Sequence, residues 1–223
     1  MSLRRALLAA LAMMVALAAG GFAGWGLHHA RASSPAATTT PAPTATTPPA
    51  ATLGAGHRRR VALFGDSLMY GSGLDVPQDL PSVLAQIRPD LDVIDLAVGG
   101  NATTDLLSRL RQVRLLNPDA VLLWVGGQDS NDTLPVPTYK ANLEKLLSAL
   151  APARVVLVTP IPDYSVSATQ FAPYAAAVRD VGRAHNLTVV DLGRPLQEQY
   201  QDDGMHLDAV NDARVARLFA TAL

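Results

Sequence analysis

The chain has 223 residues, of which 18 are basic and 19 acidic, and it contains no cysteine. Its charge is unevenly placed, because Arg4, Arg5 and Arg31 precede residue 57 while every acidic residue follows it. The part after residue 57 is therefore mildly acidic, which excludes the basic footprint of a nucleic-acid-binding domain. The lack of cysteine excludes disulfides, thiolate metal sites and cysteine nucleophiles.

Residues 1–32 are typical of an export signal or a membrane anchor. Two arginines precede an uncharged stretch from Ala6 to Leu27, and about 20 apolar residues suffice to span a bilayer as a helix. The arginines favour a cytoplasmic position for this end. Small-residue cleavage patterns occur at residues 16–18 and 30–32, so a cleaved signal peptide is the alternative. The length of the apolar stretch favours the retained anchor, and both alternatives predict an extracytoplasmic protein.

The next segment has the composition of a linker. Residues 33–52 consist only of serine, threonine, proline and alanine, and such a segment cannot bury enough apolar surface to fold. Its prolines favour an extended conformation, in which 20 residues reach roughly 60 Å. We therefore predict a linker at 33–56 and a folded domain at 57–223, with the basic run 57–60 as a solvated domain edge.

From residue 60 onward, apolar strands alternate with amphipathic helices. The first apolar run, Val61 to Phe64, shows no polar alternation, which is typical of a buried parallel strand. Strands that alternate with helices predict parallel β-α-β units in a doubly wound sheet. The predicted strands are 61–64, 92–97, 120–125, 154–159 and 187–191, and the predicted helices are 80–88, 103–116, 137–150, 171–185 and 208–222, the last carrying Val210, Val215, Leu218 and Phe219.

A candidate nucleophile follows the first strand directly. Gly65 permits a tight turn, which leaves Ser67 at the carboxyl end of a strand, where open α/β sheets bind their ligands. We interpret Ser67 as a nucleophile, against the alternative of a small polar turn or a helix cap. A serine nucleophile needs a base and a group that orients the base, and both must come from elsewhere in the chain.

His206 is the best candidate for the base. Of the other histidines after residue 56, His57 adjoins the basic run, and His185 ends a predicted helix, where a cap or dipole role suffices. Asp203 precedes His206 by three residues, a spacing that lets the carboxylate fold back onto the ring nitrogen facing away from the serine. Two further aspartates are alternatives for this orienting role: Asp202 and Asp208.

The order and spacing of four motifs resemble the SGNH/GDSL hydrolase superfamily of serine esterases and lipases over residues 60–223. The motifs are Gly65-Asp66-Ser67-Leu68, a glycine after the second strand, Gly126-Gly127-x-Asp129 after the third, and Asp203-x-x-His206 before the last helix. The resemblance implies a flavodoxin-like three-layer α/β/α sandwich with a parallel five-stranded sheet. It also implies a Ser67–His206–Asp203 triad that works without a metal or another cofactor.

The resemblance further implies an oxyanion hole with three donors. Two are the backbone N–H groups of Ser67 and Gly100, with Gly99 as a one-residue alternative. The third is an asparagine side chain in the family, where this chain has Gln128. Glutamine carries the same amide donor on one more methylene, so we predict Gln128 as the third donor. Two nearby asparagines are alternatives: Asn131 and Asn101.

Apolar residues near the nucleophile are candidates for an acyl pocket, with ordinary core packing as the alternative. Asp66 and Asp129 are predicted to tie loops to backbone N–H groups, and Trp124 is predicted to lie in the core. The pocket candidates are Leu68, Met69, Tyr70 and Leu74, and a second candidate wall comprises Tyr164 and Phe171.

We therefore expect a secreted or membrane-tethered serine esterase that hydrolyses carboxylic esters through an acyl-enzyme on Ser67. The expected partners are a small-molecule or glycan ester as substrate, the membrane through the N-terminal helix, and no nucleic acid. One alternative is an acyltransferase that moves an acyl group to or from a cell-envelope glycan. The other is a non-catalytic glycan- or wall-binding module on the same fold.

Overall fold

The computed structural model describes residues 58–162, 168–192 and 201–223. The predicted anchor at 1–32 and linker at 33–56 lie outside the described residues, as do His57 and Tyr164. Among the helices of the described ranges, none is long and apolar enough to cross a membrane.

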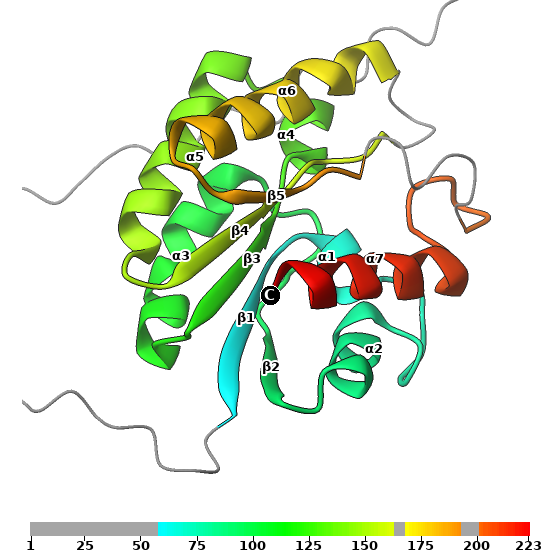
Figure 1. Cartoon of the computed structure of the whole chain (residues 1–223). Coiled ribbons are helices and arrows are strands. Elements are labelled where there is room, and N and C mark those ends of the chain that lie inside the picture. Colours follow the sequence, from blue (N-terminus) through cyan, green and yellow to red (C-terminus); the bar gives the residue numbers. More distant parts are fainter. Residues whose placement is uncertain (1–57, 163–167, 193–200) are drawn as a thin grey trace, which may run out of the picture. The chain divides into compact units, whose positions relative to one another are not determined.

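Five parallel strands form one sheet in the order β2-β1-β3-β4-β5 (Figure 1). This order is that of the flavodoxin-like doubly wound sheet, so the predicted five-stranded parallel sheet is confirmed. The predicted strand of residues 187–191 is shorter than expected, and the others differ by one or two residues at their ends. The strands are Arg59–Gly65 (β1), Leu91–Asp95 (β2), Ala120–Trp124 (β3), Arg154–Val158 (β4) and Thr188–Val190 (β5).

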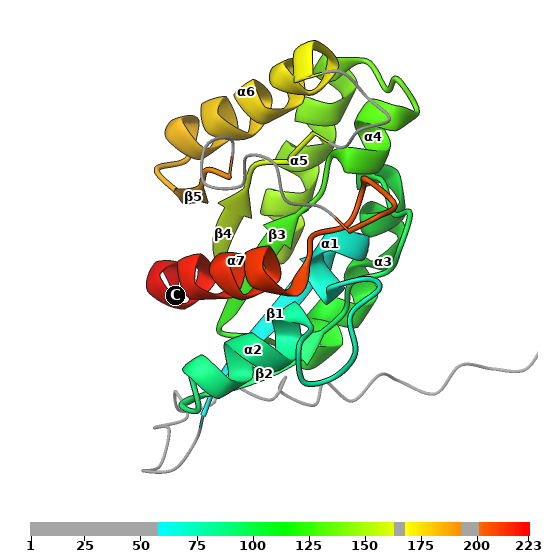
Figure 2. The ribbon, with the colours of Figure 1, turned by 90° about the vertical axis from the view of Figure 1, so that its right-hand side faces the viewer.

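Helices cover both faces of the sheet, which completes the predicted three layers (Figure 2). On one face, α2 (Leu80–Ile87) packs beside α7 (Ala209–Ala222). On the other face, α5 packs between α3 and α6. The sequence patterns did not predict two short helices, α1 and α4, which follow β1 and β3. The remaining helices are α1 (Ser67–Tyr70), α3 (Thr103–Leu116), α4 (Gly127–Asn131), α5 (Val136–Leu150) and α6 (Ala168–Ala184).

Side chains of the central strands alternate between two cores, one on each face of the sheet. Leu63 and Leu122 pack toward α2 and α7, whereas Phe64 and Leu123 pack toward α3, α5 and α6. Because both faces are covered, every residue of β3 is buried, which explains its apolar run without alternation.

The closing helix α7 buries one face and exposes the other. Phe219 is fully buried and meets Trp124 edge to face, with ring centroids 5.9 Å apart. Trp124 therefore lies in the core, as predicted. Val210 is 63% exposed, because it stands five residues before the buried Val215 and so points to a different side of the helix.

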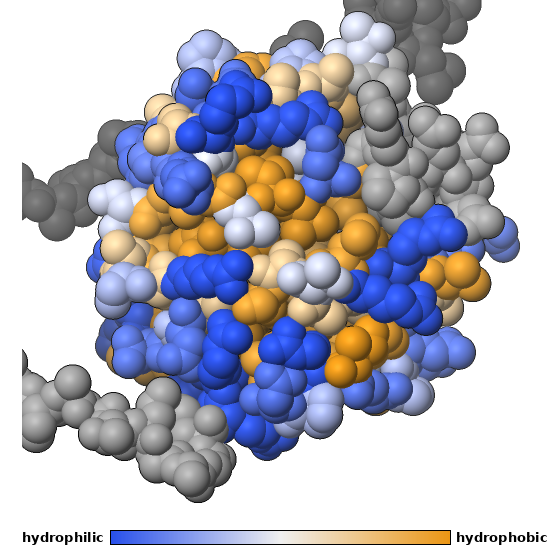
Figure 3. Space-filling view, viewed as in Figure 1, coloured by the Kyte–Doolittle hydropathy of each residue, from blue (hydrophilic) through white to orange (hydrophobic). Residues whose placement is uncertain are grey.

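The edge strand β5 has only three residues. Figure 3 shows apolar surface around β5 between α6 and α7, with hydrophilic side chains bordering it on both sides. A short edge strand offers few unpaired backbone groups, which limits pairing with another chain. The polar residues that the sequence analysis singled out lie instead in the loops at the carboxyl ends of the strands.

Candidate active site

The end of β1 places Ser67 at the carboxyl edge of the sheet. A Cβ on Gly65 would lie 2.2 Å from the carbonyl oxygen of Trp124, so only glycine permits the close pairing of β1 with β3 at this point. Asp66 then caps α1, because its side chain accepts a hydrogen bond of 3.0 Å from the backbone N–H of Leu68. Ser67 is the first residue of α1, where a backbone N–H has no acceptor within the helix.

Ser67, His206 and Asp203 form a continuous hydrogen-bonded chain. The Oγ of Ser67 lies 2.9 Å from Nε2 of His206, and Nδ1 of His206 lies 2.6 Å from Oδ2 of Asp203. When Nδ1 carries the proton, the ring donates to Asp203 and Nε2 accepts from the serine hydroxyl. The three residues that the sequence suggested for nucleophile, base and orienting group thus meet in the geometry of a catalytic triad.

Asp203 is held as an anion by the loop that follows it. Its Oδ1 accepts from the backbone N–H groups of Met205 and His206, at 2.9 and 3.0 Å. The backbone and ring hydrogen bonds from His206, with that from Met205, lower the pKa of Asp203 to about 2. Asp202 is exposed, and Asp208 is the N-cap of α7, so the geometry selects Asp203 among the three aspartates.

The segment after β2 runs beside the nucleophile. The backbone N–H of Val98 donates to the carbonyl oxygen of Gly65 over 3.1 Å, which continues the pairing of β2 with β1. A Cβ on Gly99 would lie 3.7 Å from the Cβ of Ser67, and Gly100 lines a cavity together with Ser67. Both glycines considered for the oxyanion hole therefore lie near the serine, and Gly100 borders the space where substrate would bind.

This cavity has a volume of about 40 Å³. It brings together Ser67, Gly100 and Gln128, the three residues predicted to supply oxyanion donors. Leu68, a predicted pocket residue, also lines the cavity. The rest of the lining comprises Asp66, Gly127, Asn131, Ile161 and Met205.

The remaining pocket candidates lie elsewhere. Met69 is fully buried in the core on the α2 and α7 side, because the third position of α1 faces the sheet. Tyr70 donates its hydroxyl hydrogen to Oγ of Ser72, and Leu74 is half-buried outside the cavity lining. Phe171 is buried on α6 and does not line the cavity.

Two wall residues were missed by the sequence reasoning. Met205 directly precedes His206, and this adjacency was a usable signal. Ile161 follows β4, whose carboxyl end lies at the same edge of the sheet as the other loops, but no pattern distinguishes it from its neighbours. Ile161 is 3% exposed, whereas Met205 is 37% exposed, so the first forms an inner wall and the second a rim.

Buried carboxyl groups support the loops beneath the site. Asp129 is fully buried and accepts from the backbone N–H of Thr103 at 3.0 Å and from its hydroxyl at 2.5 Å, which ties α4 to α3. Asp66 is tied in the same way to Leu68. Burial raises the pKa of Asp66 to about 7, and the charge of Asp129 adds to this increase. The two aspartates thus make the loop contacts to backbone N–H groups that the sequence suggested.

The amide of Gln128 is turned along its own helix. Its Nε2 donates to Oδ1 of Asp132 over 2.8 Å, an i,i+4 contact on α4. Asn101 is also engaged, because its Oδ1 accepts from Arg109 over 2.6 Å. The predicted donor Gln128 is therefore already bonded along its own helix, and Asn101, one of the two alternatives, has its side-chain oxygen occupied.

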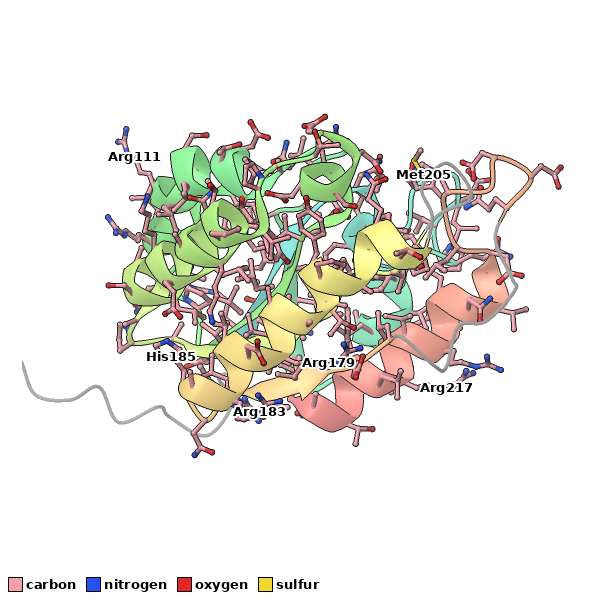
Figure 4. The ribbon with its side chains drawn as sticks, turned by 90° about the horizontal axis from the view of Figure 1, so that it is seen from above. Arg111, Arg179, Arg183, His185, Met205 and Arg217 are labelled. Carbon is pink, nitrogen blue, oxygen red and sulfur yellow. The ribbon has the colours of Figure 1, made fainter. Side chains whose placement is uncertain are left out.

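His185 lies away from this site. Figure 4 shows it at the opposite end of the molecule from Met205, which adjoins His206. The Nε2 of His185 pairs with Glu144 at 2.5 Å. Within the described residues, no group of three or more histidine or acidic side chains is placed to hold a metal ion.

A family model, described as the GDSL-like lipase/acylhydrolase family, matches residues 63–210. The chain belongs to this family. The match contains the Ser67 and His206 motifs, and it confirms the resemblance to SGNH/GDSL hydrolases.

Known relatives agree with this assignment. An arylesterase from Vibrio mimicus is 30% identical over 96 residues, which cover 41% of this chain and 48% of that protein, so the match spans about half of the relative. A lipase/acylhydrolase from Enterococcus faecalis has a TM-score of 0.67 and 27% identity, over 73% of this chain and 94% of the other. A psychrotrophic esterase from Pseudoalteromonas, with a TM-score of 0.63, 17% identity and coverage of 74% and 96%, shares the fold.

Proposed function

We propose that this GDSL-family hydrolase is a serine esterase that cleaves carboxylic esters through an acyl-enzyme on Ser67. The observation that carries this proposal is the chain of hydrogen bonds from Ser67 through His206 to Asp203. An isolated serine is a weak nucleophile, and a neighbouring base with its own orienting group is what activates it. The arylesterase and lipase/acylhydrolase relatives support the same reaction class.

The reaction proceeds in two halves. Ser67 Oγ attacks the ester carbonyl carbon while its proton moves to Nε2 of His206, and the negative charge develops on the carbonyl oxygen. The C–O bond to the alcohol then breaks, and His206 returns the proton to the leaving alcohol. In the second half, water attacks the acyl-enzyme in the same way, with His206 again as the base. This step releases the acid and free Ser67. Throughout, Asp203 stays ionised and stabilises the imidazolium.

The size of the cavity supports a short acyl group. A space of about 40 Å³ is well below the roughly 150 Å³ of an engineered protein cavity that holds benzene. Its apolar walls, Leu68 and Ile161, are buried and belong to the main core, so a longer chain that stays inside would have to displace packed side chains, and one that leaves the cavity would pass the exposed rim at Met205. We therefore propose acyl groups of a few carbons as the preferred substrates.

A panel of p-nitrophenyl esters tests both the esterase reaction on Ser67 and the preference for short acyl groups. We expect kcat/KM to fall by about tenfold or more from the acetate to the octanoate, since overpacking a core costs about 1–3 kcal/mol. Ser67→Ala should lose turnover of every ester. If wild type and Ser67→Ala behave alike, the esterase proposal fails, whereas equal rates across the panel would contradict only the acyl length. Product analysis with and without a sugar acceptor separates hydrolysis from acyl transfer.

We also propose that residues 1–32 hold the domain on the outer side of a membrane, with residues 33–56 as a spacer. The uncharged stretch after two arginines and the composition of the spacer support this arrangement. Carbonate extraction of membranes from cells expressing the full chain tests it. Retention in the membrane pellet is the expected result, and release of a shortened soluble form would indicate cleavage instead.

A further inference from the structure

The loop that carries Gly100 contains two consecutive glycines. Gly100 has a positive φ of 73°, and a Cβ built on it would meet no atom within 4 Å outside its chain neighbours. Among the described residues, no acceptor takes a hydrogen bond from the backbone N–H of Gly99 or Gly100. These N–H groups are free to bind a ligand, but glycine also has the most backbone freedom to lose. Because an oxyanion donor has to be fixed before the reaction, the loop needs support from another element.

Arg109 on α3 bonds to both ends of this loop. Its Nη2 donates to the carbonyl oxygen of Leu96 over 2.6 Å, and its Nη1 donates to Oδ1 of Asn101 over 2.6 Å. Leu96 follows β2, and Asn101 directly follows Gly100, so one guanidinium spans the segment that contains both glycines. The N–H groups of a guanidinium form a rigid planar fork, and hydrogen bonds from a charged donor are stronger than neutral ones. The fork therefore fixes the two ends of the loop relative to each other.

The guanidinium is itself held against the central sheet. Its Cζ lies 5.7 Å from the centroid of the Phe64 ring, within the distance at which an aromatic face attracts a cation. Phe64 is fully buried in β1, three residues before Ser67. A further hydrogen bond of 3.1 Å joins Arg109 to Gln112 along α3. Arg109 thus ties the loop to the same strand that positions the nucleophile.

The loop also lies directly against α1. A Cβ on Gly99 would be 3.2 Å from the hydroxyl oxygen of Tyr70 and 3.7 Å from the Cβ of Ser67. The backbone of Gly99 is therefore packed beside the helix that begins at the nucleophile. Any shift of the loop would change the space next to Ser67, where the substrate carbonyl has to bind.

We propose that Arg109 is a positioning residue for the oxyanion hole. It fixes the loop 96–101 so that the backbone N–H of Gly100 is directed at the developing oxyanion, beside the N–H of Ser67. Arg109 does not line the cavity, so it acts through the loop and does not touch the substrate. A donor held in place in this way needs no reorganisation when the negative charge forms. This proposal rests on the esterase function of Ser67.

Arg109→Ala tests the proposal with a matched control on the same helix. Displacing a catalytic group by about 1 Å can cost about 10² in rate, so we expect kcat on p-nitrophenyl acetate to fall by about tenfold or more. KM should change little, because the lost stabilisation belongs to the transition state. The control is Arg111→Ala, which should keep the wild-type kcat. Arg111 is exposed, and Figure 4 shows it pointing away from the molecule. Thermal unfolding of both variants shows whether they are folded at the assay temperature.

Binding of ethylboronic acid adds a readout that needs no turnover. The boron atom bonds to Ser67 Oγ as the serine proton passes to His206, and a boron hydroxyl occupies the position of the oxyanion. We expect Arg109→Ala to weaken this binding by about tenfold or more, as for a misplaced oxyanion donor. Unchanged binding would contradict the proposal, because a residue that only stabilises the fold would leave the adduct of a folded variant intact.

Arg109→Lys serves where the alanine variant does not fold. Lysine keeps the charge but has one compact ammonium in place of the fork that reaches two acceptors, so kcat should still fall. Full kcat in Arg109→Ala, or in Arg109→Lys where only that variant folds, would overturn the proposal. So would an equal loss in Arg111→Ala, or a loss confined to KM. In each case an inactive Ser67→Ala leaves the esterase function standing, whereas turnover by Ser67→Ala equal to that of the wild type would remove that function itself.

Discussion

At the scale of single residues, the hydrogen bonds that join Ser67, His206 and Asp203 depend on how the loop before α7 bends. Gly204 adopts a positive φ of 68°, a conformation that glycine reaches without steric cost. The bend lets Asp203 accept from the backbone N–H groups of Met205 and His206 while it also pairs with the His206 ring. Residue types and spacing were enough to nominate His206 and Asp203. They were not enough to separate Asp203 from Asp202, because that choice depends on the bend.

His206→Ala should abolish turnover nearly as fully as Ser67→Ala. The two residues act as a unit, since a serine without its base is not activated, and removing either member costs about as much as removing both. We expect kcat on p-nitrophenyl acetate to fall by about 10³ or more. The measurement is steady-state kinetics of both single variants and the double variant. Additive losses, or a loss below tenfold for His206→Ala, would mean that another group is the base.

The same scale shows why the direction of the Gln128 amide could not be predicted. The sequence identifies Gln128 by its place in a motif, but the direction of its amide depends on Asp132 one turn later.

At the scale of elements, one glutamine joins the loop of the base to the loop of the nucleophile. The Nε2 of Gln201 donates to the carbonyl oxygens of Ser72 and Leu207, each over 2.8 Å. Its backbone N–H donates to the carbonyl oxygen of His206 over 2.8 Å. Ser72 in turn donates its N–H to the carbonyl oxygen of Ser67 over 3.0 Å. Figure 2 shows the loop before α7, in orange, beside α1.

Gln201→Ala should therefore disturb the distance between Ser67 and His206. A displacement of about 1 Å in a catalytic group can cost about 10² in rate, so we expect kcat to fall by about tenfold or more with little change in KM. Gln86→Ala is a matched control, because Gln86 is exposed and its side chain makes a single hydrogen bond of 3.3 Å to Pro77. Unchanged kcat in Gln201→Ala would show that the loops hold their positions without it.

The longer elements were predictable, and the short ones were not. The helix Thr103–Leu116 was predicted with its observed bounds, because fourteen residues carry a clear amphipathic period. The helices α1 and α4 contain four and five residues, too few for a period to show. They begin at the ends of β1 and β3, so the chemistry of the site depends on the two elements that pattern analysis misses.

At the scale of the whole molecule, strand register creates the site. Gly65 at the end of β1 pairs with Trp124 at the end of β3, so the loops that follow both strands start side by side. The alternation of strands and helices predicted this shared edge, since parallel strands end on the same side. Register itself was not predictable, because buried apolar strands lack the alternation that fixes it.

The fold also buries acidic groups at a cost in stability. Asp212 on α7 is 1% exposed, and its Oδ2 has no described hydrogen-bond partner. Burial raises the pKa of Asp212 to about 7, and the charges of Asp79, the N-cap of α2, and Asp208 add to this increase. Between about pH 4 and pH 7 the folded state therefore holds a proton that the unfolded chain has released, and stability falls as the pH rises through this range.

Asp212→Asn should raise the melting temperature at pH 8 and flatten its decrease between pH 5 and pH 8. The variant removes a buried charge, and about 1 kcal/mol corresponds to roughly 2–4 °C in a domain of this size, so we expect an increase of about 3 °C or more. Asp75→Asn, at an exposed position, is the control. Part of the pH dependence should remain, because the raised pKa of Asp66 acts in the same range. A lower melting temperature at pH 8 would contradict this interpretation.

The nucleophilic role of Ser67 is tested most directly by covalent labelling with diethyl p-nitrophenyl phosphate. An activated serine attacks the phosphorus atom and releases p-nitrophenolate, which leaves one diethylphosphoryl group on its oxygen. Intact-mass and peptide analysis should show a single adduct on Ser67 in the wild type and none in Ser67→Ala. An unlabelled wild-type protein, or an adduct on another residue that persists in Ser67→Ala, would contradict the mechanism.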